Sequence, residues 1–296
     1  MAILKLIPRA LLFCLFLNGT VFAGTLPIWE LMNTSNRVLL MGSVHFLRAS
    51  DYPLPEGVNA AYDLADTLVM EINMDALDPA LAQTTMMSMG VSQSGQSLRD
   101  ALGEANYKEA SRRAEDLGVP FTMFDQYEPW FAALTITQLR MMQLGFDPAW
   151  GIETQFTQQA AGDAKNIEGL ETLEEQLGFM DNLDDKTQQQ FLLQSLEDAA
   201  TLQDQVETIV AAWRTGDVNT LEELMLEGFA SAPALEDALL IQRNRNWIRS
   251  IKNLQNKSDN YLVIVGAMHL VGENSVVAML EDKGISIRQL TDTDLN

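Results

Sequence analysis

The sequence predicts an α/β fold, in which helices pack against a β-sheet. Two apolar runs, residues 38–41 and 262–265, lie near opposite ends of the chain, and each continues into a glycine, as a buried strand does where it enters a turn. Residues 58–65 have a helical pattern and are followed by another short apolar strand, residues 67–73. The order strand, helix, strand favours a right-handed crossover within one sheet.

The chain has two histidines, His45 and His269, and both hold the same place in this pattern. Each lies three residues after the glycine that ends its apolar run, Gly42 or Gly266. A single histidine after an apolar strand is usually a hydrogen-bonded core residue. The coincidence of both favours one functional site in a crevice at the strand ends.

Residues 1–23 are expected to form a signal peptide. Lys5 and Arg9 supply a positive charge, residues 10–17 an apolar segment, and Val21-Phe-Ala23 a small-residue cleavage site. An uncleaved membrane anchor is the alternative, but it needs about 20 apolar residues, and this run is shorter and interrupted by an asparagine and a glycine.

The mature protein is therefore expected to begin near Gly24 and to form a single domain, residues 24–296. Cys14, the one cysteine in the sequence, would leave with the signal peptide, which excludes a disulfide and a thiol nucleophile. Export without disulfides suits a bacterial periplasm.

The acidic composition of the chain limits the classes of molecule that it is expected to bind. The chain has 41 acidic and 19 basic residues, and loss of two basic residues with the signal peptide takes the net charge from −22 to −24. This charge argues against nucleic acid and anionic lipid as partners. It would attract cations, although a charged surface also serves solubility. No second run is long and apolar enough for stable membrane insertion. The oligomeric state is left open.

In chain order, residues 26–32 are expected to form the first strand, and residues 33–36 the turn into the strand that ends at Gly42. Glu71 is the anomaly of the following strand, because an unpaired carboxylate is costly to bury after an apolar run. It either lies at an exposed strand end or is held by a metal or another cation.

Residues 78–256 are mostly helical in composition and are expected to form a cap over the active edge of the sheet. Residues 184–215 read as one long helical stretch. The methionines at helical spacing are expected to fill the core; they are Met86, Met87, Met89, Met141 and Met142.

Residues 167–171 look like a short strand within this cap. Thr172 and Glu175 then form a predicted capping box, which gives Glu175 a structural role and leaves Glu171 free for another.

Arg243, Arg245 and Arg249 lie on the last helix before the second histidine. Arg245 and Arg249 are four residues apart and share a face, where surface ion pairing is expected, whereas Arg243 points elsewhere.

Several motifs stand in order along the chain: Gly42-Ser-Val-His45, Glu71, Pro129-Trp130, Gly145-Phe-Asp147, Gly151-Ile-Glu153, Gly169 to Gln176, Trp213 with Gly216-Asp217, Arg243-Asn244 with Trp247, and Val265 to Gly272. In this order they resemble the TraB/GumN proteins, relatives of the Tiki metalloproteases, over essentially the whole mature length.

The resemblance implies a mixed β-sheet flanked by helices, like that of the erythromycin esterases and ChaN haem-linked proteins. It implies that the two G-x-x-H histidines and the strand glutamate meet in one site. Tiki members look like metal-dependent proteases that trim secreted proteins. The expected function is therefore a metal-dependent hydrolase that cleaves peptides or exported proteins.

The residues themselves limit the chemistry. There is no H-E-x-x-H motif and no obvious serine elbow. Two histidines and a carboxylate suffice for a divalent metal (Mn, Co or Zn) that keeps an open position for water. The hypothesis makes His45, Glu71 and His269 metal ligands or a general base, Glu153 a second acid, and Arg243 a clamp on the developing oxyanion.

Two alternatives stay open. One is a metal-independent, esterase-like hydrolase in which a histidine activates water and Glu71 orients it, so that activity survives chelation. The other is a non-catalytic periplasmic protein that binds a peptide, a metal or haem and turns over no substrate.

Overall fold

The computed structural model describes residues 25–295. The predicted signal peptide, residues 1–23, and Cys14 lie outside the described residues. Within residues 25–295, no helix combines the length and the apolar character needed to cross a membrane.

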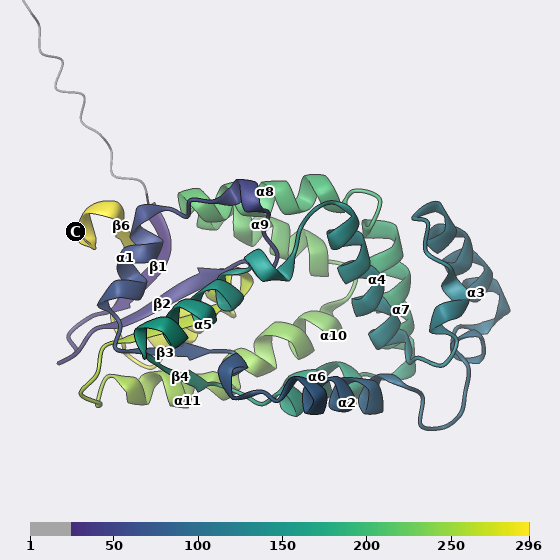
Figure 1. Cartoon of the computed structure of the whole chain (residues 1–296), viewed down its shortest axis with the longest axis horizontal. Helices are drawn as coiled ribbons and strands as arrows, with labels where there is room; N and C mark the ends of the chain where they lie inside the picture. Colours follow the sequence, from purple (N-terminus) through teal and green to yellow (C-terminus); the bar gives the residue numbers. More distant parts are fainter. Residues whose placement is uncertain (1–24, 296) are drawn as a thin grey trace, which may run out of the picture.

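A mixed sheet of six strands forms the centre of the fold and confirms the predicted α/β class (Figure 1). Four adjacent strands are parallel, and β1 runs antiparallel to both of its neighbours. The spatial order is β4 (Asn166–Gly169), β3 (Thr67–Met70), β5 (Tyr261–Gly266), β2 (Val38–Ser43), β1 (Thr25–Leu31) and β6 (Ile287–Thr291).

The strands that precede the two histidines are neighbours at the centre of this sheet. β2 and β5 pair in parallel, from Val38 opposite Tyr261 to Ser43 opposite Gly266. Almost all of their residues are buried, because helices cover both faces of the sheet. This burial explains why the sequence shows continuous apolar runs here and not an alternating pattern. The carboxyl ends of β2 and β5 therefore lie side by side.

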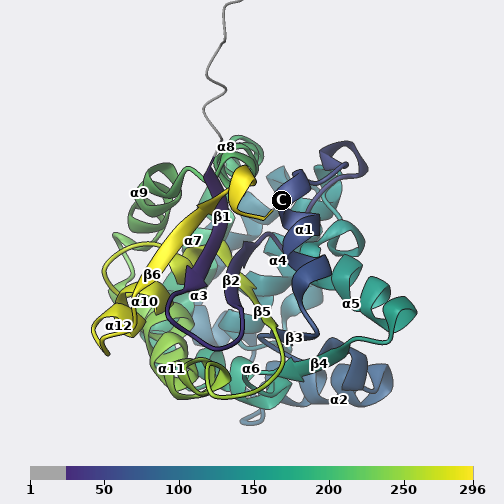
Figure 2. The same cartoon turned by 90° about the vertical axis from the view of Figure 1, so that its left-hand side faces the viewer.

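Two helical layers enclose the sheet, one on each side of the strands (Figure 2). One layer packs against Leu39 and Met41, and the other against Val38 and Leu40, as expected for side chains that alternate across a strand. The first layer contains α1 (Glu56–Leu64), α5 (Ile152–Asp163) and α8 (Leu202–Thr215), and the second α11 (Gln242–Leu254) and α12 (Val276–Glu281).

The other helices extend beyond the carboxyl ends of the strands, and α3, α4 and α7 form a helical lobe far from the sheet (Figure 1). This lobe has its own hydrophobic cluster, which includes Tyr107, Phe121 and Ile136. The helices are α2 (Pro79–Gly90), α3 (Leu98–Asp116), α4 (Pro129–Gln143), α6 (Leu173–Asp181), α7 (Asp185–Asp198), α9 (Val218–Phe229) and α10 (Pro233–Glu236).

Two local predictions are wrong. The single helical stretch over residues 184–215 is two helices, α7 and α8, because the chain turns where the Thr201 N–H bonds to the Asp198 carbonyl. The methionine prediction is wrong for Met86 and Met142, which are 36% and 52% exposed, but Met141 does lie in the core. In contrast, the capping box of Thr172 and Glu175 is present at the start of α6.

Candidate functional site

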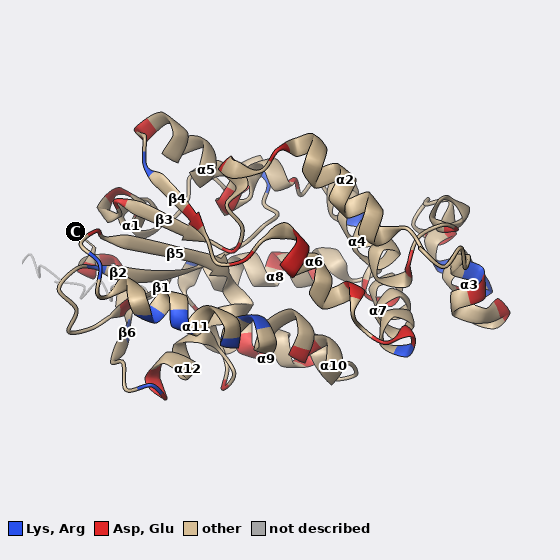
Figure 3. Ribbon diagram, turned by 90° about the horizontal axis from the view of Figure 1, so that it is seen from below, with Lys and Arg blue, Asp and Glu red and all other residues tan. Residues whose placement is uncertain are grey.

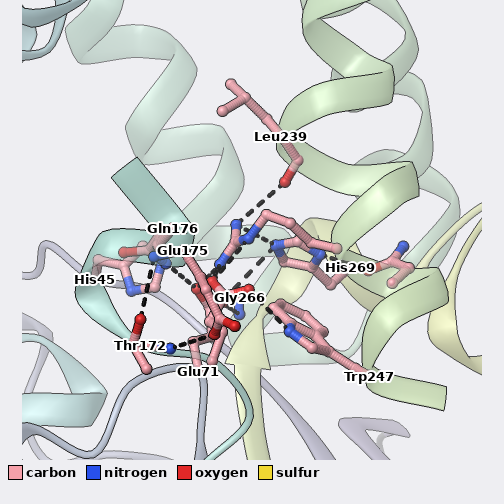
Figure 4. A network of polar contacts seen from close by, with 12 residues as sticks. His45, Glu71, Thr172, Glu175, Gln176, Leu239, Trp247, Gly266 and His269 are labelled. Atoms are coloured by element: carbon pink, nitrogen blue, oxygen red, sulfur yellow. Dashed lines mark hydrogen bonds and ion pairs between the residues drawn. The ribbon is translucent and has the colours of Figure 1, made fainter. Parts of the chain in front are cut away.

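Four ionisable side chains follow four adjacent parallel strands. Glu171 comes shortly after β4, Glu71 directly after β3, His269 after β5, and His45 after β2. Parallel strands end at the same edge of a sheet, and the crevice at that edge is where α/β proteins bind ligands. Figure 4 shows His45 and His269 on opposite sides of Gly266, with Glu71 below them.

Gly266 marks the point at which three of the predicted site residues meet. A Cβ atom at this position would lie 3.4 Å from His45 Nε2, 3.5 Å from Glu71 Oε1 and 3.5 Å from His269 Cδ2. A side chain here would fill the space that these groups face. Gly42, the matching glycine, also permits a close approach, because its Cβ would lie 3.0 Å from the Cα of Ala267.

Glu71 is buried and held by a cation, which is one of the two alternatives that the sequence left open. Its carboxylate accepts hydrogen bonds from the Gly266 N–H at 2.7 Å, Gln176 Nε2 at 3.0 Å and Arg243 Nη2 at 2.5 Å. Burial alone would raise the pKa of Glu71, but Arg243, the two histidines and the Gly266 N–H together hold it well below its ordinary value. Glu71 is therefore ionised.

His269 is buried, and its ring orientation is fixed through Nδ1. Asn244 Nδ2 donates to the carbonyl of Asn274 at 2.9 Å, so Asn244 Oδ1 faces His269 Nδ1 at 2.6 Å and accepts a hydrogen bond from the Nδ1–H. The lone pair of the neutral ring is then on Nε2, which lies 3.2 Å from Arg243 Nη1 and 3.8 Å from Glu71 Oε1. Burial lowers the pKa of His269 to about 3, although Glu71 opposes the shift.

His45 is held in the same manner, by a carboxylate. Its Nδ1 lies 2.8 Å from Glu153 Oε1, which also accepts a hydrogen bond from the Ser43 hydroxyl. Glu153 raises the pKa of His45 to about 9, against the opposing effect of burial. The His45 side chain is 54% exposed, so water screens part of this attraction.

The start of α5 brings Glu153 to His45. The Ile152 N–H donates to the Val44 carbonyl at 3.2 Å, which docks the first turn of the helix on the chain beside His45. A Cβ atom on Gly151 would lie 2.1 Å from the His45 carbonyl oxygen, so this contact requires glycine. The Gly-Ile-Glu motif therefore combines a close backbone approach with the carboxylate that holds His45.

Arg243 donates all five of its N–H groups within the protein. Nε and Nη2 donate to Glu171 Oε1 at 3.0 and 2.6 Å, and Nη2 also donates to Glu71. Nη1 donates to the Leu239 carbonyl at 3.1 Å and to His269. Arg243 is predicted from the sequence to clamp a developing oxyanion, but in this arrangement it has no free N–H for a substrate.

The predicted metal ligands do not fit a metal ion in this arrangement. No group of three or more His, Cys, Asp or Glu side chains among residues 25–295 is placed to hold one. His269 Nε2 and Glu71 Oε1 are 3.8 Å apart, a separation that two ligands of one ion can have, but Arg243 donates to the lone pair of that nitrogen. The site therefore holds a guanidinium between His269 and Glu71.

Several residues of the site had no predicted role. Gln176 ends the motif that begins at Gly169, and Asn244 follows Arg243; the two side chains orient Glu71 and His269. Trp247 donates to Glu171 Oε2 at 3.0 Å and packs against the His269 ring, with 4.6 Å between ring centroids. The capping box left Glu171 without a structural role, and this was the signal that could have placed it here.

A cleft of about 850 Å³ opens beside the site, and Glu171 and Trp247 belong to its wall. None of its lining residues is Lys or Arg, and Glu174, Glu175 and Asp237 add negative charge. Acidic residues also occur across the sheet layers and the helical lobe (Figure 3). The cleft is thus an acidic approach to the residues at the strand ends.

Comparisons with known proteins find relatives that are similar to this chain in sequence. The chain is 24% identical over 270 residues to a protein named YbaP from Escherichia coli (strain K12), with 86% of this chain and 92% of the relative covered. It is also 24% identical over 254 residues to YbaP from Shigella flexneri, with 81% and 86% covered.

A shorter match, 31% identical over 81 residues, joins 27% of this chain to 14% of a protein named metalloprotease TIKI homolog from Amphimedon queenslandica. No solved structure matches the chain. The model of the TraB/PrgY/gumN family matches residues 27–289, which include all of the site residues described above, and the chain belongs to this family.

Proposed function

We propose that this protein is a hydrolase that cleaves peptide bonds in exported polypeptides. The observation that carries the proposal is the convergence of His45, Glu71 and His269 at Gly266. Each imidazole is held through Nδ1; His45 Nε2 is left for chemistry, whereas His269 Nε2 accepts a hydrogen bond from Arg243. Family membership and the partial similarity to a protein named metalloprotease TIKI homolog support the same class of reaction.

His45 is the proton-transfer group of the proposed reaction. The deprotonated form of His45, which increases as pH rises towards its pKa of about 9, accepts a proton from water through Nε2, and Glu153 stabilises the imidazolium that forms. The water oxygen attacks the carbonyl carbon of the peptide bond. The imidazolium then gives its proton to the nitrogen of the leaving amine as the C–N bond breaks.

Glu71 positions the attacking water in this mechanism. Its Oε1 atom is fixed by the Gly266 N–H and faces the same space as His45 Nε2. Arg243 keeps Glu71 ionised, so Glu71 accepts a hydrogen bond from water and does not compete for the proton. The proposed mechanism uses protein side chains alone, because those of residues 25–295 do not fit a metal ion in this arrangement.

The cleft supports a polypeptide as substrate. Its volume of about 850 Å³ lies within the range of about 300–1,000 Å³ that is usual for ligand sites. Its negative charge favours segments that carry Lys or Arg near the scissile bond. The substrate would meet the enzyme in the periplasm, and N-terminal sequencing of exported protein should give a start near Gly24.

The test is turnover of a peptide library by chelator-treated protein, with and without added Mn²⁺, Co²⁺ or Zn²⁺. His45→Ala and His269→Ala should each remove most of the turnover per folded molecule, and the double variant should lose little more, because groups that act as a unit are not additive. Arg245→Ala, on the exposed face of α11, is the matched control and should keep full activity.

Unchanged turnover in both single variants, with additive losses of stability, would make the two histidines structural and refute the proposal. Activity that survives chelation supports the protein-only mechanism. Activity that is lost on chelation and restored by one ion identifies a metal-dependent hydrolase.

A further inference from the structure

A second pocket adjoins His269 through Asn244 and shares no lining residue with the cleft described above. Its volume is about 240 Å³, and a cavity of about 150 Å³ is already large enough for benzene. The wall is formed by α9, by the end of α10 with the turn Asp237–Ile241, and by the chain that follows β5. The pocket can therefore hold a group about as large as one side chain.

The buried part of this pocket is apolar. Met225, Leu240 and Val271 belong to its lining, and each is buried. Leu226 extends the apolar surface towards solvent, and this side chain is 54% exposed. Met268 lines the pocket as well, and methionine side chains adapt to ligands of different shape. An aliphatic chain would therefore gain free energy by entering the pocket, because it would leave water.

The charged residues of the lining are all acidic. Glu222, Glu236 and Glu273 belong to the lining, and no Lys or Arg does. Within residues 25–295 none of these three carboxylates has a hydrogen-bond or ion-pair partner. Glu222 and Glu236 are also half-buried, where an unpaired carboxylate is costly. The lining thus favours a cation, and an organic one, because the side chains of this part of the chain are not placed to hold a metal ion.

The same pocket is in contact with the residues that orient His269. Asn244 is 1% exposed and belongs to the lining, and its Oδ1 accepts the hydrogen bond from His269 Nδ1. Asn274, whose carbonyl accepts a hydrogen bond from the Asn244 amide, lines the pocket too. Met268 directly precedes His269 in the turn Ala267–Leu270. A molecule in the pocket therefore changes the surroundings of His269.

We propose that this pocket binds a primary alkylammonium group and transmits its presence to His269 through Asn244. The alkyl chain lies on the apolar lining, and the ammonium donates hydrogen bonds to the glutamates. A free alkylamine and the lysine side chain of a polypeptide share this chemistry. The inference goes beyond the proposed hydrolase, since it concerns a second ligand site and holds whether or not a substrate is cleaved.

The first experiment measures binding of n-butylammonium, which reproduces the carbon stem and the ammonium of lysine. Calorimetric titration of the wild type at low salt should give one site with a dissociation constant of about 1 mM or lower. Butyrate keeps the length of the chain but reverses the charge, and tetramethylammonium keeps the charge but lacks the chain. Each should bind at least about tenfold more weakly, because each satisfies only half of the pocket.

Glutamine variants show where the ammonium binds. Glu222→Gln/Glu236→Gln should weaken binding of n-butylammonium by at least about tenfold. The matched control is Glu223→Gln/Glu227→Gln, which removes the same charge from exposed positions of α9 outside the pocket. This control should bind n-butylammonium as tightly as the wild type does.

Nuclear magnetic resonance of isotope-labelled histidine then measures the effect on the candidate site. Saturating n-butylammonium should shift the signals of His269 and leave those of His45 in place, and Glu222→Gln/Glu236→Gln should abolish the shift. An acetyl-lysine amide, compared with its norleucine analogue, tests the polypeptide source. The same shift from the lysine compound supports a polypeptide ligand, and a shift from n-butylammonium alone supports a free amine.

Three results would overturn the inference. The wild type could fail to bind n-butylammonium, or bind butyrate equally well. The variant Glu222→Gln/Glu236→Gln could keep the affinity of the wild type, which would place the ammonium elsewhere on an acidic surface. Binding could also leave the His269 signals unchanged, so that the pocket would not reach the site. None of these measurements uses turnover, so the hydrolase proposal stands or falls separately.

Discussion

Replacement of Glu153 by Gln tests the link between carboxylate and imidazole on which the mechanism depends. Glutamine has nearly the same shape and can still accept a hydrogen bond from His45 Nδ1, but it removes the charge that lies 2.8 Å away. Glu153 is the largest cause of the raised pKa of His45, about 9. The substitution should therefore lower that pKa towards the ordinary value of about 6.5.

The expected shift follows from the exposure of the ring. Two unit charges about 4 Å apart interact by about 1 kcal/mol in water and by about 4 kcal/mol at the dielectric typical of a protein surface. Half of the His45 side chain faces water, which favours the lower part of this range. With about 1.4 kcal/mol for each pKa unit, the pKa of His45 should fall by about 1 to 2 units.

Nuclear magnetic resonance of isotope-labelled histidine measures this shift directly. The chain has two histidines, so two rings give signals, and the His45→Ala variant assigns them. Glu174→Gln, an acid of the cleft wall, is the control and should leave the His45 titration in place. The rising limb of kcat/KM against pH should move with the pKa. An unchanged His45 pKa in Glu153→Gln would refute the assignment of Glu153 as its charge partner.

Three further predictions concern the site and its support. Gly266→Ala places a methyl group within 3.5 Å of His45, Glu71 and His269. Turnover in a peptide assay should therefore fall by about tenfold or more, while the melting temperature stays near that of the wild type. Full turnover would contradict the idea that these three side chains act together at Gly266. The pKa of His269 is about 3 in the folded state and about 6.5 in the unfolded state, so between these pH values the unfolded state binds one more proton. As pH falls from about 6.5 to 3, the free energy of unfolding measured in urea titrations should therefore decrease by a few kcal/mol more in the wild type than in His269→Gln. Parallel curves for the two proteins would refute burial of a neutral ring. Trp213→Phe removes the Nε1–H that donates to the buried Gly42 carbonyl at 2.7 Å, and it should lower the free energy of unfolding by about 1–3 kcal/mol in the same titrations. The control is Trp150→Phe, at a position that is 38% exposed. A loss in Trp213→Phe no larger than in this control would show that the hydrogen bond does not stabilise the strand.

The sequence predicts the centre of the site better than its surroundings. The repeated pattern of an apolar run, a glycine and a histidine indicates two strands that end at one edge, and β2 and β5 do so as neighbours. Glu71 is noticeable because a carboxylate directly after an apolar strand needs a partner. Arg243 is noticeable because it lies off the face shared by Arg245 and Arg249. Each signal is local and depends on the pattern within a few residues.

The hydrogen-bond partners of these residues could not be predicted, because they come from helices that are distant in the sequence and reach the strand ends only in the folded protein. Asn244 meets His269, and Gln176 meets Glu71, only after α11 and α6 reach the strand ends. The break between α7 and α8 contains no Gly or Pro, so no residue type marks it. The choice between a metal and Arg243 at His269 Nε2 is also beyond a sequence pattern, since both satisfy the same lone pair.

The position of β5 in the sheet determines at what stage of synthesis the candidate site can form. β5 lies between β3 and β2, yet its residues, 261–266, are made near the end of the chain. Until they arrive, β2 and β3 share no hydrogen-bonded neighbour, and pairings between such distant segments form slowly. A nascent chain that ends before residue 261 thus already carries His45, Glu71 and Arg243 but lacks the strand that lies between β2 and β3. The site can therefore form only once β5 is in place, and fragments that end before residue 261 should lack the site as a whole, not merely one of its histidines.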